Sequence, residues 1–393
     1  MMSAVLSNPV HPEYGVATIP FPIPRDQYAH CMELLEALEI GDAVKADCKV
    51  EKIDSFYTVL KRTEMLTVNV EELNYLAKRL DSFDTGEAAQ FQAMAHKLEL
   101  FKLKDLINLT FCCQQATVIS DFSDLAAVGR DHYMNLHGGS ASVDELNKLD
   151  GKGTARQLIE NGGGTVTPYG VVYDNGMKLE QVYDGRFFPC YYYKPNVITV
   201  AVTSKAEPED TEHITWLYLP MIQEEIGRAL LRGGITDPSE IRLSLEDSWL
   251  PHEVLDLLDM DHVDISELNA LVQALDEFSD MSIRKYAAAA VMARPHTTEQ
   301  AKHLAENLDL FDFAPSASTP EEYGKYMIRQ SGRFDYDENL DAFYDYEKYG
   351  TERTKEEDGM FTDRGYIAYK GYISIEEVMN GGQSNRMVMR GMM

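Results

Sequence analysis

The sequence predicts an α+β protein that contains two related units in tandem. Short β-branched segments alternate with amphipathic segments of helical periodicity, which is typical of mixed modules. The chain has 393 residues, enough for two or three domains, and 44% of them are hydrophobic, so there is material for ordinary cores. The pattern of elements also begins again near residue 196, which favours a duplicated arrangement.

In the first half, residues 1–14 carry no clear pattern and are expected to be loose. Apolar residues at helical spacing predict a helix over DQYAHCMELLEALEI, with Asp26 as its N-terminal cap. Further helices are expected over 68–83, 85–97, 102–109 and 124–136, and strands over 15–24, 54–60, 117–120, 169–174 and 186–193, the last interrupted by Pro189.

The second half starts with a β-branched strand over 196–204, a polar turn and a strand over 214–220 that ends at Pro220. Helices are predicted over 221–234, 263–278, 282–293, 298–308, 319–330 and 337–349. Residues 361–373 close the unit as strand and turn. The tail after 373, rich in glycine and methionine, is expected to be flexible.

Two helical segments carry the repeat. VNVEELNYLAKRLDSF (68–83) and VDISELNALVQALDEF (263–278) share Val, Glu-Leu-Asn, Leu, Leu-Asp and Phe in register. Gly129 and Gly324, and Gly170 and Gly365, keep the same spacing, and Pro24 and Pro220 come within one residue of it. The predicted domains are therefore 1–190, 196–373 and a tail, 374–393.

The net charge of −29 limits the partners. It argues against binding to nucleic acid or to an anionic membrane and favours a basic surface. The excess is concentrated, because residues 207–360 hold 35 Asp and Glu against 13 Lys and Arg. At one charge per ~1.7 Å of duplex axis, that excess equals the charge of roughly 11 base pairs. A decoy of a DNA segment would need a charge of this order.

The segment DYDENLDAFYDYEKYG (335–350) is the strongest candidate for a partner-binding surface. Asp337, Asp341 and Asp345 recur every four residues, so on a helix they would lie along one face. Leu340, Phe343 and Tyr344 would lie on another face, against a core. The candidate acidic residues are Asp335, Asp337, Glu338, Asp341, Asp345 and Glu347. The aligned segment of the first unit, SASVDELNKLDGKGTA, lacks most of them.

Other chemistries are weakly indicated. A glycosidase would need two converging carboxylates, which sequence cannot show. A calcium loop is suggested by the acidic run 259–267, but the glycine and spacing of an EF-hand are missing. No zinc-protease, phosphate-loop or serine-nucleophile motif occurs. RFFPCYYYKP could stack on bases, although packing inside the protein is favoured. We therefore expect a non-catalytic protein without cofactor or metal.

The five cysteines are odd in number and fit no zinc pattern, so free thiols in a reducing cytoplasm are expected. The N-terminus shows no charged segment followed by an apolar run, and no stretch of ~18 apolar residues occurs. A signal peptide and a membrane span are therefore not expected.

Several of these segments resemble the ArdA family of antirestriction proteins. In the second unit they are ITWLYLP, SELNALVQAL, NLDAFYDYEKYG and FTDRGYI, and in the first, more diverged unit they are IPFPIP, EELNYLAKRLDSF, KDLINLTF and PYGVVYDNG. Their order and spacing carry the resemblance, which covers about residues 15–373.

The resemblance implies elongated, typically dimeric proteins built from small α+β modules and carried by mobile elements. It implies a DNA mimic that occupies the DNA-binding groove of type I restriction-modification enzymes, on their methyltransferase core. A second acidic track, Asp256, Asp259, Asp261 and Asp264, followed by Glu267, would add to the mimic surface. The alternative is an acidic adaptor that binds another basic protein, either defence-related or regulatory.

Overall fold

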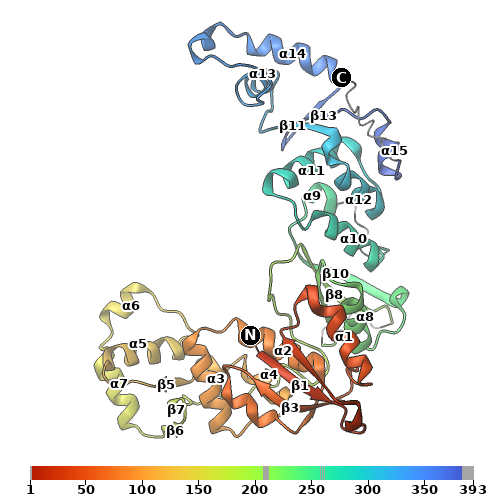
Figure 1. Cartoon of the computed structure of the whole chain (residues 1–393). Coiled ribbons are helices and arrows are strands. Elements are labelled where there is room, and N and C mark those ends of the chain that lie inside the picture. The colour runs from red at the N-terminus through yellow and green to blue at the C-terminus, as the bar shows by residue number, and fades with distance from the viewer. Residues whose placement is uncertain (1, 207–211, 257, 259, 261, 383–393) are drawn as a thin grey trace, which may run out of the picture. The chain divides into compact units, whose positions relative to one another are not determined.

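A computed structural model describes residues 2–206, 212–256, 258, 260 and 262–382 (Figure 1). The chain divides into two compact units. Unit 1 comprises Met1–Lys194 and Gly227–Gly234, and unit 2 comprises Pro195–Ile226 and Ile235–Met393. Each unit contains two small antiparallel sheets with helices, so the predicted α+β class is confirmed.

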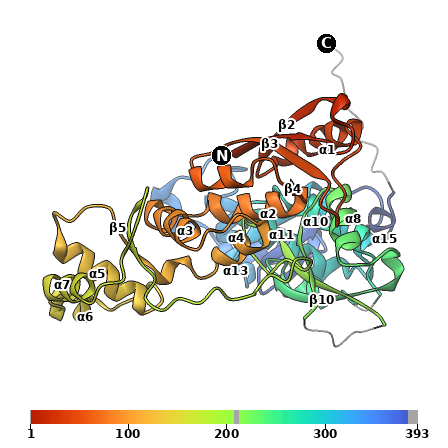
Figure 2. The ribbon, with the colours of Figure 1, turned by 90° about the horizontal axis from the view of Figure 1, so that it is seen from below.

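Unit 1 starts with a four-stranded sheet in the order β2-β1-β3-β4. Helices α2, α3 and α4 lie on one side of it (Figure 2). The central strand β1 pairs with both neighbours and buries Ala4 and Leu6, so the expectation that residues 1–14 are loose was wrong. Burial of alternate side chains holds this short strand in place. The strands are Met2–Ser7 (β1), Val16–Phe21 (β2), Cys48–Asp54 (β3) and Thr67–Val68 (β4).

The remainder of unit 1 supplies helices and a second sheet in the order β5-β7-β6. The helices are Tyr28–Ala37 (α1), Val70–Asp81 (α2), Thr85–Lys97 (α3), Leu103–Leu109 (α4), Leu125–Leu136 (α5), Val143–Lys148 (α6) and Gly151–Glu160 (α7). The strands are Thr117–Ile119 (β5), Thr165–Thr167 (β6) and Gly170–Tyr173 (β7).

Two strands predicted in unit 1 are absent among its described residues. The segment 54–60 leads into a 3₁₀ helix, Thr58–Thr63 (η3), where the Tyr57 hydroxyl donates to the Leu80 carbonyl at 2.6 Å. The segment 186–193 forms no strand, because its rings pack on α2 instead. Phe188 stacks on Tyr75 with ring centroids 4.5 Å apart. The aromatic residues of this segment pack against a helix. Their alternation in the sequence cannot distinguish this arrangement from a β-strand.

Unit 2 has a similar order of elements, although its first sheet has three strands instead of four. Its first sheet has the order β10-β8-β9, and its second has the order β11-β13-β12. The strands are Ile198–Ser204 (β8), Thr215–Leu219 (β9), Ile241–Ser248 (β10), Phe311–Pro315 (β11), Met360–Thr362 (β12) and Gly365–Tyr369 (β13). Helix α8, Gln223–Arg232, starts in unit 2, and its residues from Gly227 onward belong to unit 1. The other helices of unit 2 are His252–Leu255 (α9), Ile265–Leu275 (α10), Asp280–Ala293 (α11), Thr298–Glu306 (α12), Pro320–Arg329 (α13), Tyr346–Glu356 (α14) and Ile375–Met379 (α15), with a 3₁₀ helix Glu338–Phe343 (η7).

The start of the predicted tail is ordered. Ser374 caps α15 through a capping box with Glu377, and Val378 and Met379 are buried. The expectation of a flexible tail was therefore wrong for 374–382, where the cap and two apolar side chains hold the helix. The remaining tail residues, 383–393, lie outside the described part of the chain.

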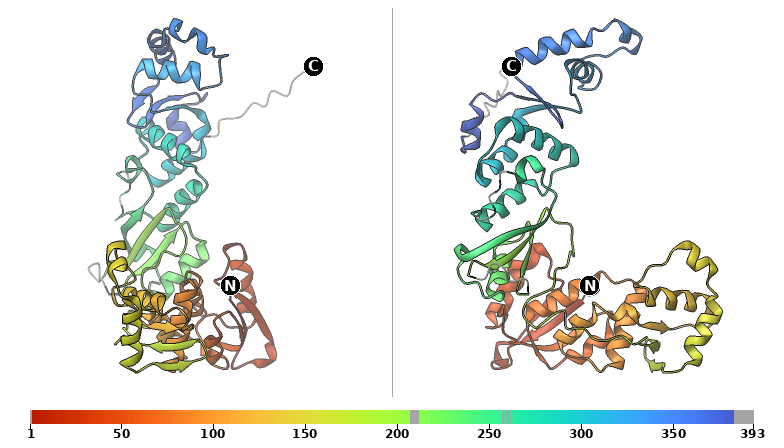
Figure 3. Two further views of the ribbon diagram at one scale, coloured as in Figure 1. Left: turned by 90° about the vertical axis from the view of Figure 1, so that its left-hand side faces the viewer. Right: turned by 180° about the vertical axis from the view of Figure 1, so that it is seen from behind.

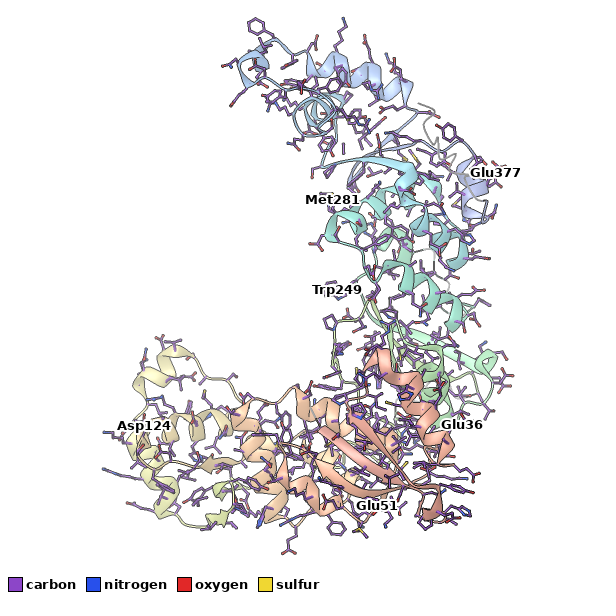
Figure 4. All side chains as sticks on the ribbon, viewed as in Figure 1. Glu36, Glu51, Asp124, Trp249, Met281 and Glu377 are labelled. Carbon is purple, nitrogen blue, oxygen red and sulfur yellow. The ribbon has the colours of Figure 1, made fainter. Side chains whose placement is uncertain are left out.

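The first sheets of both units share a β-bulge. In β3 the register against β1 skips Glu51, which is labelled in Figure 4. In β10 the register against β8 skips Glu246, 195 residues later. A bulge leaves one residue unpaired and bends its strand, so its recurrence at the same spacing is a specific likeness.

The asparagine of the Glu-Leu-Asn motif makes the same contact in both units. The side-chain oxygen of Asn74 accepts from the backbone N–H of Ile23, and that of Asn269 accepts from Met221, both at 2.9 Å. Each of these donors follows a cis proline, Pro22 or Pro220. The counterpart of Pro220 is thus Pro22, and the pairing with Pro24 expected from sequence was wrong by two residues.

The second sheets also close with matched turns. The Thr167 hydroxyl donates to the Gly170 carbonyl, and the Thr362 hydroxyl donates to the Gly365 carbonyl, each at 2.8 Å. Both glycines have positive φ, 128° and 141°, a region that favours glycine. Four side-chain and backbone details therefore recur at a spacing of 195 or close to it.

Glycine residues set the close approach of α13 and α14, which lie side by side (Figure 3). A Cβ at Gly324 would lie 2.1 Å from the Tyr346 carbonyl oxygen, and a Cβ at Gly350 would lie 1.7 Å from that of Pro320. In unit 1, a Cβ at Gly129 would lie 1.8 Å from the Gly151 carbonyl oxygen. The backbones of each helix pair therefore meet where a side chain would not fit.

We expect Gly324→Ala to destabilise unit 2 by about 1–3 kcal/mol, because the added methyl group must push α14 away. Urea denaturation of the full chain measures this change. The matched control is Gly227→Ala in α8, where nothing lies within 4 Å of an added Cβ. That variant should keep its stability or gain up to about 1 kcal/mol. Equal losses in both variants would show that the crossing tolerates a side chain.

The C-terminal part of α8 contributes a buried arginine to unit 1. The Arg232 side chain is 5% exposed, and its guanidinium lies over the Phe188 ring at 4.4 Å. The guanidinium donates to the carbonyl oxygens of Ala43, Gly185 and Arg186 and to the side-chain oxygens of Asn69 and Tyr183. The Tyr183 hydroxyl donates in turn to the Glu72 carboxylate at 2.9 Å. The charge is thus fully bonded, which is the condition for burying an arginine.

Candidate partner-binding surface

The acidic segment of unit 2 does not form the single helix predicted over 337–349. It forms η7 and then α14, and the backbone changes direction between them at Tyr344. Asp337 caps η7 by accepting from the Asn339 N–H at 2.9 Å, and Asp345 caps α14 by accepting from the Lys348 N–H at 3.0 Å. Aspartate side chains compete with the helical backbone for such bonds, so a recurrent aspartate can start two short helices as readily as line one.

Asp341 is the centre of a cluster that we call the Asp341 clamp, formed by Arg329, Tyr336, Asp341 and Tyr346. The Arg329 guanidinium donates to the carboxylate through two nitrogens, at 2.9 Å and 2.5 Å. The Tyr336 hydroxyl donates to it at 2.7 Å, and the Tyr346 hydroxyl also donates to it. The clamp ties α13, the segment before η7, and α14 to one carboxylate.

The clamp changes the electrostatics of its members. Hydrogen bonds from Arg329, Tyr346 and Tyr336 hold the pKa of the Asp341 carboxyl well below its usual range. The bond to Asp341 raises the pKa of the Tyr336 phenol to about 12, and the same carboxylate raises the pKa of Arg329. A carboxylate bonded to one guanidinium and two phenols presents little charge of its own. Asp341 therefore differs from its acidic neighbours.

These shifts predict that the clamp resists acid. Because the folded pKa of Asp341 is lowered, its stabilising contribution is present above about pH 4, the unfolded value, and is lost only as the pH falls through the lower folded pKa. Carboxyl carbon NMR of Asp341 should show no titration between pH 7 and pH 4. In alkali, Tyr336 should ionise near pH 12, and Asp341→Asn should bring that value back toward 10. An unchanged Tyr336 titration in this variant would contradict the clamp.

The other carboxylates of the segment are exposed. Asp335, Glu338 and Glu347 make no side-chain hydrogen bond or ion pair with any residue that the structure describes. Asp337 and Asp345 are exposed as well, although each also caps a helix. The segment thus presents five carboxylates to solvent and retains a sixth, Asp341, in the clamp.

Two side chains that were expected to pack on a core are exposed instead. Leu340 is 47% exposed and Phe343 is 83% exposed, so that prediction was wrong for both. Tyr344 is half-buried, with its ring centroid 6.0 Å from that of Tyr336 and 5.8 Å from that of Tyr346. The helical face that would have buried the first two does not exist, because the single helix does not form.

The second acidic track is only partly described. Asp256 is exposed at the end of α9, and Asp264 caps α10 by accepting from Ser266 and Glu267 N–H groups. Asp259 and Asp261 lie outside the described residues. In Figure 1, α11 and the β11–β13 sheet separate α10 from α14. The described part of the second track at the start of α10 therefore does not adjoin the carboxylates of α14.

Unit 1 lacks the clamp. At a spacing of 195 residues, Arg329 corresponds to Met134 and Tyr336 to Ala141. Asp341 corresponds to Leu146, and Tyr346 to Gly151. The counterpart of η7 is α6, which keeps an N-terminal cap at Ser142. The two units thus differ both in the number of carboxylates in this segment and in the side chains that bind the Asp341 carboxylate of unit 2.

A cavity of about 470 Å³ in unit 2 is lined by α11, β11 and α13, and includes Lys285 and Tyr366. One of about 440 Å³ in unit 1 lies between α5, α7 and the end of β7. Neither contains a pair of converging free carboxylates. No group of three or more His, Cys, Asp or Glu side chains in the described ranges is arranged to hold a metal.

The five cysteines are free, and four of them are buried. Burial raises the pKa of Cys31, Cys48, Cys112 and Cys113, which disfavours the reactive thiolate. Among the helices that the structure describes, none combines the length and the apolar character that crossing a membrane requires.

Part of the chain matches a known protein family. Residues 211–368 match the family model of the antirestriction protein ArdA. The matched range lies almost entirely in unit 2, and includes η7, α14 and the Asp341 clamp. No curated protein matches the chain.

Proposed function

We propose that unit 2 is an antirestriction module that mimics DNA and occupies the DNA-binding groove of a type I restriction-modification enzyme. The match of residues 211–368 to the ArdA model supports this proposal most directly. The exposed carboxylates of the acidic segment agree with it, and no catalytic step is involved. In this proposal the protein acts in the cytoplasm and binds the methyltransferase core.

Electrostatics explains how such a module competes with DNA. An enzyme that contacts many phosphates gains most of its affinity by releasing counterions from the duplex. A folded protein that presents Asp335, Asp337, Glu338, Asp345 and Glu347 at fixed positions offers the same basic groove a replacement for those phosphates. The clamp and the two helix caps hold the backbone of the segment in place, so that its exposed carboxylates lie at fixed spacing.

We further propose that the chain is a fused pair of related units, in which unit 1 has diverged. Its support is the similar order of elements, the bulges at Glu51 and Glu246, and the matching contacts of Asn74 and Asn269. In this view unit 2 carries the mimic surface and unit 1 serves as its scaffold.

A competition titration tests the function. A purified type I methyltransferase bound to labelled cognate duplex is mixed with increasing amounts of the full chain at fixed salt. Displacement of the duplex at near-stoichiometric protein is expected. The control is the full chain in which three exposed carboxylates of unit 2 are reversed, Asp335→Lys, Glu338→Lys and Glu347→Lys. This variant should displace the duplex much less.

The opposite result would be no displacement across enzymes from several type I families. That outcome would reject the proposed target and leave the match of residues 211–368 as a statement about family alone. The acidic protein would then be examined as an adaptor, by testing basic proteins other than these enzymes.

A further inference from the structure

The short helix η7 sorts its side chains into three rows. In a 3₁₀ helix there are three residues per turn, so side chains at i and i+3 eclipse each other. Glu338 and Asp341 therefore form one row, and Leu340 and Phe343 form another. The Asp341 row faces the clamp, because its carboxylate is bonded to Arg329. The apolar row is consequently turned away from the clamp.

Solvent exposure agrees with this arrangement. Phe343 is 83% exposed and Leu340 is 47% exposed, in a segment that otherwise presents carboxylates. Here the two exposed apolar side chains are neighbours in one row. A partner that covered both would recover the free energy that their exposure costs in the free protein.

We infer that Leu340 and Phe343 form an apolar knob that enters an apolar pocket in the basic groove of the partner, while the carboxylates around it contact basic side chains. This inference rests on the proposed function and adds a salt-independent part to the binding. Buried aromatic anchors ringed by polar contacts are typical of the residues that carry most of the affinity in protein interfaces.

The charges around the knob determine which occupant fits. In the sequence it is flanked by five exposed carboxylates, Asp335, Asp337, Glu338, Asp345 and Glu347. A second copy of this face would bring like charges together, which opposes association. A protein with Lys and Arg around a pocket is complementary in both charge and polarity.

The equivalent positions in unit 1 do not carry a knob. At a spacing of 195 residues, Leu340 corresponds to Glu145 and Phe343 to Lys148. The exposed apolar residue of α6 is Val143, which is 74% exposed and takes the place of Glu338. The apolar row is therefore a property of unit 2, like the clamp that orients it.

The test measures competition for the type I methyltransferase at several salt concentrations. For the double variant Leu340→Ser and Phe343→Ser, we expect binding about tenfold weaker or more at every salt, with an unchanged slope of log affinity against log salt. For the triple variant Asp335→Asn, Glu338→Gln and Glu347→Gln, the slope of log affinity against log salt should become shallower. Its loss of affinity relative to the wild type should decrease as the salt concentration rises. Val143→Ser in unit 1 is the matched control for removing an exposed apolar side chain and should bind like the wild type.

Three outcomes would overturn the inference. A double variant that competes like the wild type would show that the partner does not contact the knob. A double variant that turns a sedimenting dimer into a monomer would assign the knob to contact between copies of this chain. If the wild type displaces no duplex at all, the proposed function fails, and the knob proposal fails with it. This outcome differs from the first one, in which the wild type and the double variant both displace the duplex. An unchanged Tyr336 titration near pH 12 verifies that η7 remains clamped in each variant.

Discussion

Reversing three exposed carboxylates of unit 2 is expected to weaken competition with DNA by about 100-fold or more. The variant is Asp335→Lys, Glu338→Lys and Glu347→Lys. These side chains cap no helix and lie outside the clamp, so the fold should be retained. In the groove, each new cation would face a cation, and such like-charge contacts cost several kcal/mol. The competition titration at fixed salt measures the loss.

The control places the same charge change in unit 1, at the exposed Asp144, Glu160 and Glu36. Because both variants change the net charge equally, a long-range effect would weaken them equally. A local effect weakens only the unit 2 variant. Equal losses would reject the assignment of the mimic surface to unit 2 and favour an acidic protein that binds through its overall field.

Replacing Arg232 by methionine is expected to destabilise unit 1 by about 3–5 kcal/mol, because a buried ion network loses its cation and leaves its acceptors unpaired. Urea denaturation of the full chain measures the change. Arg156→Met, on the exposed side of α7, is the control and should stay within about 0.5 kcal/mol of the wild type.

The loss should depend on pH in a defined direction. Burial raises the pKa of Glu72, while Tyr183 and Arg232 lower it, so removing Arg232 raises it further. A carboxyl with a raised folded pKa stabilises the native state below its unfolded pKa, and this contribution is lost as the pH rises through the folded value. Arg232→Met should therefore cost less at pH 5 than at pH 8. Adding Glu72→Gln should remove the difference, and a loss that is independent of pH would contradict the network.

Much of the fold was predictable because its signals are local. The Glu-Leu-Asn helices were located by periodicity, and the structure adds that Asn74 and Asn269 make the same contact, each with the residue after a cis proline. The central strand β1 was missed because six residues beside a polar loop give too short a pattern. Its place is fixed by pairing with the nearby strand β2 and with β3, which is distant in sequence.

The candidate surface was harder to predict. Aspartates every four residues indicate a helical face or successive caps equally well, and only the backbone around Asp337 and Asp345 distinguishes them. Arg329 lies 12 residues before Asp341, so no local pattern pairs them. Tyr336 and Tyr346 were visible as aromatics among the charges, but their hydroxyl bonds to Asp341 were not. Phe343 was expected to be buried on the apolar face of a single helix, and that face does not exist because the segment forms η7 and α14 instead.

A glycine at the helix crossing of unit 1 excludes a clamp like that of unit 2. A Cβ at Gly151 would lie 2.6 Å from the Ala126 carbonyl oxygen, whereas the residue 195 positions later is Tyr346, a member of the clamp. Any side chain at Gly151 therefore meets the backbone of α5. A tyrosine at this position could supply its hydroxyl to a neighbouring carboxylate only if α5 and α7 moved apart.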